Sequence, residues 1–271
     1  MKKTDVLFHE TFPPQSEYIS ALIKLGADQY CGTKEEISEI TGIPTGKQKG
    51  KVVPHIKYAA FMGLLSYSED NKKYCLQLTE LGQKVAVNDL FLFENITKQV
   101  CHYNLSDPVN GAYLWSYLLY RVPHTLEESI GINYVKDKLA QEFGFQVELG
   151  VVRSSYIGGF FDALDYVDWD DKSIVFRHSF VLEQNTGLYA YTLLNSWEKM
   201  FPSKNEITID DITEVLKWGV SYGFDREDVM MALDMIAQRR YIQVNRQLFP
   251  VTVARLQASS SVLNDLYADL I

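Results

Sequence analysis

Apolar side chains recur at a helical spacing soon after the start of the chain. The spacing of three and four residues predicts an amphipathic helix that ends near Gly26. Pro13 and Pro14 disfavour a helix before it, so residues 1–17 are expected to be an extended lead-in. The apolar stripe is formed by Ile19, Leu22, Ile23 and Leu25.

A second helix is predicted to begin at Thr33. Thr33 and Glu36 have the spacing of a capping box, in which each side chain satisfies a backbone N–H of the other residue. This helix is expected to turn Ile37 and Ile40 inward and to stop at Gly42. Residues 43–46 then form a turn, and another helix runs to about residue 65.

Apolar and polar positions alternate in the segment that follows. The alternation in residues 65–67 and 74–78 predicts two strands, and residues 69–73 form a polar hairpin tip. Helix, helix, turn, helix and hairpin together are typical of a winged helix-turn-helix domain. The predicted fold class is mostly α with small β-hairpins: an N-terminal winged helix, then helical and winged-helix-like units.

The helix-plus-hairpin pattern returns twice later in the chain. Helices are expected at 133–143 and 150–164 before a hairpin within 166–180. Two more are expected at 209–220 and 225–237, before strands at 241–244 and 248–251. The predicted segments are a DNA-contacting domain at 1–88, an aromatic-rich helical linker at 89–130, a second helix-plus-hairpin unit at 131–200 and a C-terminal winged-helix-like unit at 201–271.

The charge balance narrows the range of functions. The 271 residues carry a net charge of −9, whereas proteins that coat nucleic acid indiscriminately are usually basic. Contact with DNA therefore requires a local basic surface. Such a surface is predicted before and within the third helix, where residues 40–68 contain no acid and residues 46–58 contain four lysines. The expected DNA-binding residues are Lys47, Gln48, Lys49, Lys51, His55, Tyr58, Lys72 and Lys73.

Helical geometry assigns the faces of this third helix. At about 100° per residue, Ile56 and Leu64 fall on the packed side with Val53 and Ala60. Lys51, His55 and Tyr58 fall on the opposite side, where DNA is expected. Gln48 and His55 are the candidates for base edges, and the lysines for phosphates. The alternative is a solvated lysine surface on a module that contacts only protein.

The last predicted unit has the opposite charge. Acids dominate residues 206–234, so this surface is expected to repel phosphate and to contact a protein partner or a second copy of the chain. Arg239, Arg240 and Arg246 give it one small basic edge.

A catalytic or metal centre is not expected. Phosphate-binding, nucleophile-elbow and zinc-protease motifs are absent, and Cys101 and His102 are neighbours that point about 100° apart on a helix. The acids between Asp162 and Asp171 are interpreted as a helix end and a solvated turn. No cofactor and no metal are predicted, and the chain is not expected to be an enzyme.

The cysteines and the hydropathy indicate a compartment. The chain has an odd number of cysteines, and none of them has the CxxC spacing of a zinc site: Cys31, Cys75 and Cys101. Neither a disulfide framework nor a zinc site is therefore expected. No apolar stretch is long enough for a membrane span. A reducing cytoplasm is the expected location.

Several short motifs resemble the domain of unknown function 4007 family, most clearly over residues 6–120. They are the opening 8–12 (FHETF), residues 58–65 (YAAFMGLL), 78–82 (LTELG) and 112–115 (AYLW). The resemblance implies a bacterial protein encoded near DNA phosphorothioation and other phage-defence systems, and it supplies no catalytic residues.

The sequence thus predicts a non-catalytic, DNA-binding accessory or regulatory protein of a bacterial DNA-modification or phage-defence system. Its partner would be double-stranded DNA through the first unit, with a protein partner or a homodimer through the later units. Two alternatives stay open: an adaptor whose winged helices bind only protein, and a metal-dependent nuclease.

Overall fold

Capping residues begin and end the first helices of the chain. In the computed structural model, which describes residues 2–46, 50–247 and 249–268, the hydroxyl of Thr33 accepts from the backbone N–H of Glu36, and the Glu36 carboxylate accepts from that of Thr33. Gly42 ends the helix in the left-handed conformation that glycine adopts without strain. Both features confirm the sequence prediction.

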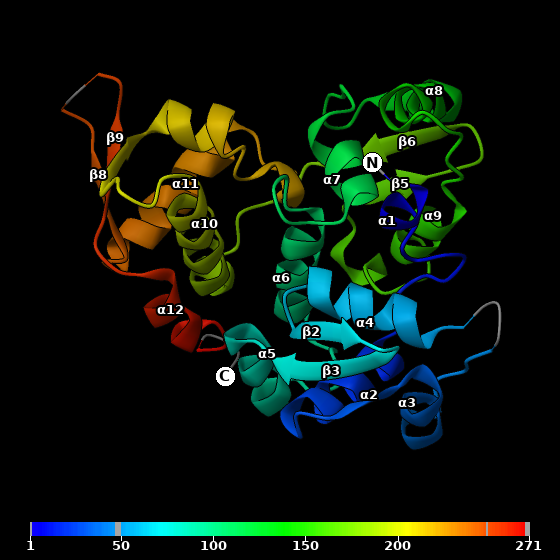
Figure 1. The fold of residues 1–271 in the computed structure, drawn as a ribbon. Helices are drawn as coiled ribbons and strands as arrows, with labels where there is room; N and C mark the ends of the chain where they lie inside the picture. Colours follow the sequence, from blue (N-terminus) through cyan, green and yellow to red (C-terminus); the bar gives the residue numbers. More distant parts are fainter. Residues whose placement is uncertain (1, 47–49, 248, 269–271) are drawn as a thin grey trace. The chain divides into compact units, whose positions relative to one another are not determined.

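The chain divides into two compact units, Met1–Arg177 and His178–Ile271 (Figure 1). These units differ from the four predicted segments, whose independence as domains stays a prediction. The first unit contains α1 (Lys3–Val6), α2 (Ser16–Ala27), β1 (Cys31–Thr33), α3 (Lys34–Thr41), α4 (Val52–Phe61), β2 (Leu65–Asp70), β3 (Lys73–Leu78), α5 (Glu80–Asn88), α6 (Asn95–Ser106), α7 (Tyr113–Tyr120), β4 (Ser129–Gly131), α8 (Ile132–Phe143), α9 (Gly150–Tyr156), η1 (Asp162–Leu164), β5 (Val167–Trp169) and β6 (Ser173–Phe176).

The second unit is built around its longest helix, which packs against the helices that follow it. Its elements are η2 (Glu183–Asn185), α10 (Thr186–Met200), β7 (Glu206–Thr208), the π-helical turn η3 (Asp211–Val215), η4 (Val220–Tyr222), α11 (Arg226–Gln238), β8 (Ile242–Asn245), β9 (Thr252–Arg255), α12 (Ser259–Val262) and η5 (Leu263–Asp265).

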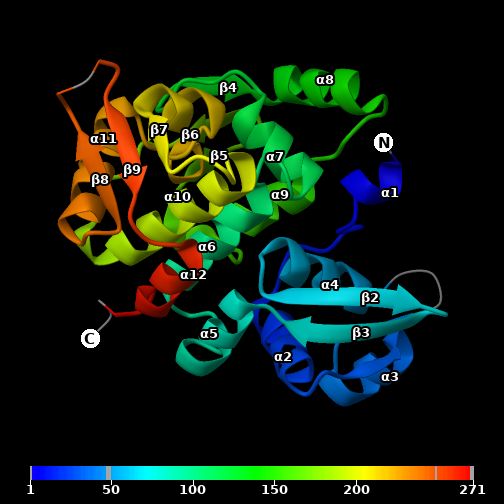
Figure 2. The ribbon, with the colours of Figure 1, turned by 60° about the vertical axis from the view of Figure 1, so that its left-hand side comes forward.

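One connectivity occurs three times. A helix is followed by a three-residue strand, by two or three helical segments and by a hairpin, and the three strands form an antiparallel sheet in which the last strand lies in the centre. The sheet orders are β1-β3-β2, β4-β6-β5 and β7-β9-β8, and the three hairpins can be followed in Figures 1 and 2. The predicted fold class, mostly helical with small β elements, is confirmed. The predicted threefold repeat of helices and a hairpin is confirmed as well.

Several local predictions are wrong. Residues 3–6 form the short helix α1 within the segment expected to be extended, and Ile40 is more than half exposed instead of inward. The helix expected at 150–164 ends at Tyr156, and the one expected at 209–220 is replaced by the shorter segments η3 and η4. These departures shift boundaries and leave the order of helices and hairpins intact.

A disulfide bond joins Cys31 of β1 to Cys75 of β3, which are direct cross-strand partners. The expectation that the odd cysteine count excludes a disulfide is therefore wrong, because Cys101, the third cysteine, is buried as a free thiol within α6. The bond closes a loop over a sequence separation of 44 residues.

The core of the first unit joins its opening sheet to the aromatic helices behind it. Ile19, Leu22 and Ile23 of α2 are fully buried where the helix packs against α4 and β3. Each such side chain contributes about 1.5–3 kcal/mol by leaving water. Trp115 of α7 is also fully buried and contacts the rings of Phe8 and Tyr58 edge-on or tilted. Every helix among the described residues is too short or too polar to cross a lipid bilayer.

Candidate nucleic-acid interface

The starts of α3 and β3 and the loop before α4 meet at one end of the first sheet. Thr33, which caps α3, is the cross-strand partner of Lys73. The next residue, Lys34, donates from Nζ to the backbone oxygen of Gly46 over 3.0 Å. This chain of contacts defines what we call the lysine end of the sheet, formed by Lys34, Lys51, Lys72 and Lys73; the hairpin turn and the beginning of α4 can be followed there in Figure 1.

The β2–β3 hairpin carries its two lysines into solvent, as predicted. Asn71 and Lys72 form the turn, with φ angles of 50° and 64°, and two successive residues at positive φ match the twist of a tight hairpin. Lys72 and Lys73 are exposed, but so are Glu69 and Asp70 on the preceding strand. The hairpin tip therefore offers two exposed ammonium groups beside two exposed carboxylates.

Lys51 lies just before α4, and its position is partly buried. Its Nζ donates to Oε1 of Gln15 over 3.2 Å and lies 5.1 Å from the ring centroid of Tyr18 and 5.8 Å from that of Phe12. An amide oxygen and two rings leave its charge unneutralised. The first turn of α4 contains no acid, so this end of the helix stays favourable for an anion.

His55 and Tyr58 do not face solvent, and their assignment to the DNA-facing side is wrong. Both side chains are fully buried. Nδ1 of His55 donates to the backbone oxygen of Lys51 over 2.7 Å, and Tyr58 donates to that of Phe12 over 3.1 Å. The segment containing Phe8 and Phe12 covers the face of α4 that the helical wheel left open.

Burial also sets the charge of these two side chains. Loss of water lowers the pKa of His55 to about 4 and raises that of Tyr58 well above its usual value. His55 is therefore neutral at pH 7 and serves to pack α4. Neither residue can read a base edge from its buried position.

Six of the predicted DNA-binding residues remain, and the structure describes three of them. Lys47, Gln48 and Lys49 lie outside the described residues. Lys73 lies opposite Thr33, next to Lys34, which the sequence prediction missed, and Lys34 contacts the loop that ends at Lys51. The sequence did show that Lys34 directly follows the capping residue Thr33. Its contact with Gly46, 12 positions later, depends on tertiary packing and could not be predicted from the local sequence.

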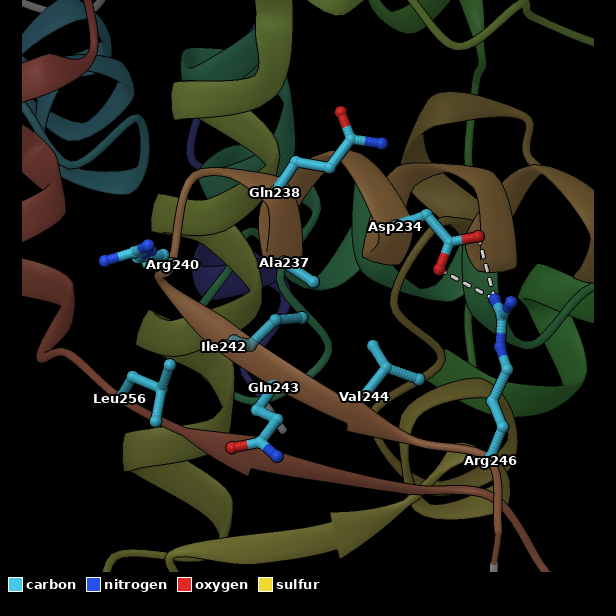
Figure 3. A pocket seen from close by; sticks show the side chains of 9 residues that line it. All are labelled: Asp234, Ala237, Gln238, Arg240, Ile242, Gln243, Val244, Arg246 and Leu256. Carbon is cyan, nitrogen blue, oxygen red and sulfur yellow. Dashed lines mark hydrogen bonds and ion pairs between the residues drawn. The ribbon is translucent and has the colours of Figure 1, made fainter.

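The second unit contains a hollow of about 660 Å³ between α11 and β8 (Figure 3). Arg246 makes ion pairs of 2.7 and 2.8 Å with the two carboxylate oxygens of Asp234. Ala237, Ile242 and Val244 supply an apolar lining. The small basic edge expected from the sequence is thus largely neutralised at Arg246, and the hollow is a weaker candidate for phosphate than the lysine end.

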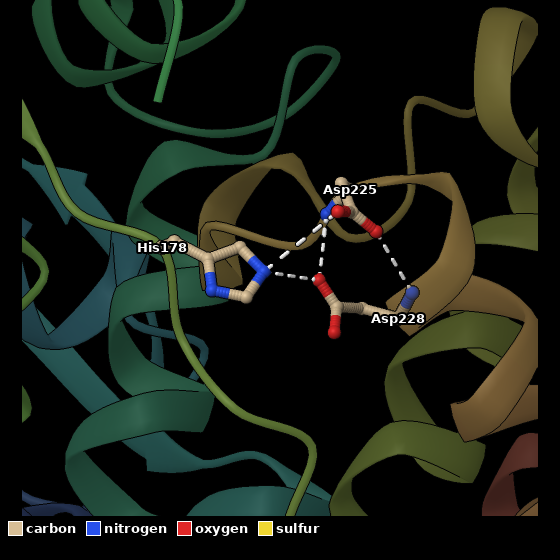
Figure 4. A group of neighbouring side chains, drawn as sticks. All are labelled: His178, Asp225 and Asp228. Atoms are coloured by element: carbon tan, nitrogen blue, oxygen red, sulfur yellow. Dashed lines mark hydrogen bonds and ion pairs between the residues drawn. The ribbon is translucent and has the colours of Figure 1, made fainter. Parts of the chain in front are cut away.

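His178, Asp225 and Asp228 form a group that sequence inspection missed, because His178 lies 50 positions before Asp228 (Figure 4). Nε2 of His178 lies 2.7 Å from Oδ2 of Asp228 and 3.8 Å from Oδ2 of Asp225. The offered ligand atoms all lie within 4.8 Å of one another, a spacing that a metal ion could bridge.

The carboxylates of this group already cap a helix. Asp225 is the N-cap of α11 and accepts from the backbone N–H groups of Glu227 and Asp228, at 2.7 and 2.9 Å. Asp228 accepts in turn from the backbone of Asp225 at 3.0 Å. The N–H of Asp228 is the main cause of a lowered pKa at Asp225, helped by that of Glu227 and by the nearby His178. A capping box with a histidine attached accounts for the geometry.

The acids around the second hairpin each have a local partner. Asp168 and Asp165 face Arg177 at 3.2 and 3.5 Å, and Asp171 faces Arg153 at 3.3 Å. Asp162 and Asp170 accept backbone N–H groups, at 2.7 Å each. These contacts are those of turns and surface ion pairs, in agreement with the sequence interpretation.

Two solved structures share the fold. They are described as an SspB crystal structure and a magnesium ion-bound SspB crystal structure, and both superpose with a TM-score of 0.73. The sequence identities are 13% and 12%, and each superposition covers 97% of this chain and 86% of the other. A scan against models of protein families and a search of curated proteins both find no match. At this identity, the likeness establishes the fold alone.

Proposed function

We propose that this chain is a DNA-binding accessory or regulatory protein of a bacterial DNA-modification or phage-defence system, without catalytic activity of its own. Its first three-stranded unit would act as a winged-helix-like module on double-stranded DNA, with the loop that ends at Lys51 towards the duplex and the β2–β3 hairpin as the wing. A cytoplasmic location is part of the proposal, because the target DNA lies there.

The observation that carries the proposal is the lysine end of the first sheet. β1–β3 pairing places Lys73 opposite Thr33, which precedes Lys34. Lys34 reaches Gly46 in the loop that ends at Lys51, although its ammonium also lies 3.8 Å from Glu35. A chain with a net charge of −9 would otherwise repel phosphate. Because lysine acts as a point charge, these residues would fix position on the backbone more than they would read sequence.

The resemblance of the opening motif and the α4 motif to the domain of unknown function 4007 family supports the defence or modification setting. Phe8 and Phe12 of the opening motif have a structural role, because both contact Tyr58 and so hold α4 in place. The buried His55 and Tyr58 are left out of the proposed contact surface.

Charge reversal beside α4 tests the proposal. The double change Lys49→Glu and Lys51→Glu is expected to abolish binding of a short duplex at low salt while the circular dichroism spectrum stays unchanged. The matched control is Lys2→Glu with Lys172→Glu, which gives the same net charge away from this surface and includes the equivalent tip of the β5–β6 hairpin. Equal affinities for the two variants would reject the assigned surface.

An adaptor that binds only protein is a second candidate, favoured by one observation. Phe91 and Phe93 are 53% and 73% exposed and stack with ring centroids 6.0 Å apart. An exposed apolar pair of this kind commonly marks a protein contact. Sedimentation equilibrium of the wild type and of Phe91→Ser with Phe93→Ser would reveal a dimer held by this pair.

The nuclease alternative has its own test. One of the similar structures is described as magnesium ion-bound, so supercoiled plasmid should be incubated with the pure protein and Mg²⁺ or Mn²⁺. We expect no cleavage. Nicking by the wild type that is lost in Asp228→Asn or in Asp168→Ala would replace the accessory role with an enzymatic one.

A further inference from the structure

The Cys31–Cys75 bond lies where the first sheet differs from its two repeats. Each of the three sheets attaches a three-residue outer strand to the central strand of a hairpin. At the register position of the bond, the second sheet pairs Ser129 with Val175, and the strands of the third sheet contain no cysteine. The chain therefore forms this sheet twice without a disulfide, so the topology does not require the bond.

The three outer strands also differ in their middle residue. In β4 and β7 it is an isoleucine, Ile130 or Ile207, and its partner on the central strand is also apolar. In β1 it is Gly32, opposite Tyr74, and the ring of Tyr30 from the same segment lies where a side chain of Gly32 would be. Apolar pairs across neighbouring strands stabilise a sheet. Because β1 lacks this pair, its attachment to β3 depends more strongly on the covalent bond.

Small thiols can reach this bond. Cys31 is exposed and Cys75 is half-buried, whereas Cys101 is a buried free thiol. The thiolate of a small thiol can attack Sγ of Cys31 and release Cys75, and a second thiol then attacks the mixed disulfide and releases Cys31. Two electrons and two protons pass from the small thiols to the protein sulfurs, and one small disulfide forms. The same exchange in reverse closes the bond.

Loss of the bond acts on the lysine end through β1. Two positions after Cys31, Thr33 pairs with Lys73 and caps α3. The next residue, Lys34, donates to the backbone oxygen of Gly46. A β1 strand that can leave the sheet therefore loosens the cap of α3 and the position of Lys34 relative to Lys73.

We propose that thiol–disulfide exchange at Cys31–Cys75 regulates duplex binding at the lysine end. The closed bond holds β1 on the sheet and keeps the lysines in one arrangement, which reduces the entropy lost when they bind DNA. The open form binds more weakly. This inference rests on the proposed function, because it names a regulator of the same surface. In a reducing cytoplasm the resting form is the dithiol, so a small disulfide that closes the bond strengthens binding.

Hydrogen exchange of the oxidised and reduced full chain tests the release of β1. After reduction with dithiothreitol under native conditions, the backbone amides of residues 31–41 are expected to exchange faster, and those of β4 and β7 should change less. Maleimide labelling of the native protein should count two new reactive thiols. Equal protection of residues 31–41 in both states, or a bond that dithiothreitol leaves intact without denaturant, would overturn the proposal.

Fluorescence anisotropy of a labelled short duplex at low salt measures the regulation. Reduction of the wild type should weaken binding by about fivefold or more, because the lysines must then be ordered on the DNA. Reoxidation with glutathione disulfide should restore the affinity. Cys101→Ser alters only the buried free thiol and should keep the full response.

Two variants fix the open form. Cys31→Ser with Cys75→Ser should bind like the reduced wild type, with or without thiol. If this variant fails to fold, Cys31→Ser with Cys75→Val copies the pair Ser129–Val175 of the second sheet and should likewise be insensitive to thiol. A thiol response that persists in either folded variant would show that another group carries it, and the assignment would be wrong.

The failure of the duplex proposal can be told apart from the failure of this one. If neither the oxidised nor the reduced wild type binds duplex, the proposed function fails and its regulation fails with it. If both forms bind duplex with equal affinity, only the regulation is overturned, and the lysine end contacts DNA without help from β1.

Discussion

Tyr58 donates its phenolic hydrogen to the backbone oxygen of Phe12 across 3.1 Å, joining two residues that are 46 positions apart. The hydroxyl is buried, and so is the ring, which meets Phe8 edge-on at 4.8 Å. The bond ties the opening segment of the chain to α4. This contact explains why α4, although it follows a lysine-rich loop, has so few side chains exposed to solvent.

Tyr58→Phe should lower the free energy of unfolding by about 1–3 kcal/mol, because the oxygen of Phe12 loses its partner in a buried place. Urea denaturation measures the change. Tyr113→Phe, at an exposed tyrosine, is the control and should have a much smaller effect. Duplex affinity at low denaturant should change less than twofold; a large loss of affinity in a stable Tyr58→Phe variant would restore this residue as a DNA contact.

The Cys31–Cys75 bond should stabilise the first sheet. Removal by Cys31→Ser with Cys75→Ser should cost about 2–4 kcal/mol, because a closed loop of this size restricts the unfolded chain. Guanidinium titration of wild type and variant, each with and without dithiothreitol, separates the effects. The wild type should become as unstable as the variant on reduction, and an unchanged wild-type midpoint would contradict the bond.

Acid should destabilise the protein between about pH 6.5 and pH 4. Burial lowers the pKa of His9 and His55 to about 4 and that of His102 to about 3. In this window the unfolded chain binds protons that the folded chain excludes, so each histidine makes stability fall by about 1 kcal/mol per pH unit as the pH drops. Above the unfolded pKa of about 6.5 their contribution is constant.

His102→Phe isolates one of these histidines. The variant should be less stable at pH 7, since Tyr156 loses its 2.8 Å partner, but its stability should fall less steeply on acidification. Thermal unfolding at half-unit pH steps gives both slopes. Parallel slopes for wild type and variant would show that His102 titrates normally.

The group His178, Asp225 and Asp228 should behave as a helix cap. Asp225→Ala should destabilise the second unit by about 1 kcal/mol, whereas Asp225→Ser should retain most of the stability, because serine is also a good N-cap. Differential scanning fluorimetry with and without Mn²⁺ or Zn²⁺ completes the test. A metal-dependent rise in the wild-type melting temperature that both variants lose would identify a metal site instead.

The order of helices and hairpins could be predicted because its signals are local. The capping box at Thr33, the left-handed Gly42 and the alternation on each side of the β2–β3 turn depend on residues a few positions apart. The strands β1, β4 and β7 have three residues each, too few for a periodic pattern, so the third strand of every sheet was missed. The disulfide depends on β1 and was missed with it.

The face of α4 could not be predicted from its own periodicity. A helical wheel assumes one packed side, but α4 packs on α2 and β2 and is also covered by the opening segment. His55 and Tyr58 are therefore buried on the side that the wheel assigned to solvent. The lysines at the hairpin tip were assigned correctly to the surface because a tight turn leaves its side chains exposed in any tertiary setting.

The salt dependence of duplex binding tests the central claim most directly. About three or four phosphate contacts from the lysine end predict a slope of about −3 for log affinity against log salt concentration. Lys72→Gln with Lys73→Gln should lower the magnitude of this slope by about 2, whereas Lys2→Gln with Lys172→Gln should leave it unchanged. A wild-type slope near zero, or the same slope in both variants, would contradict DNA contact through this surface.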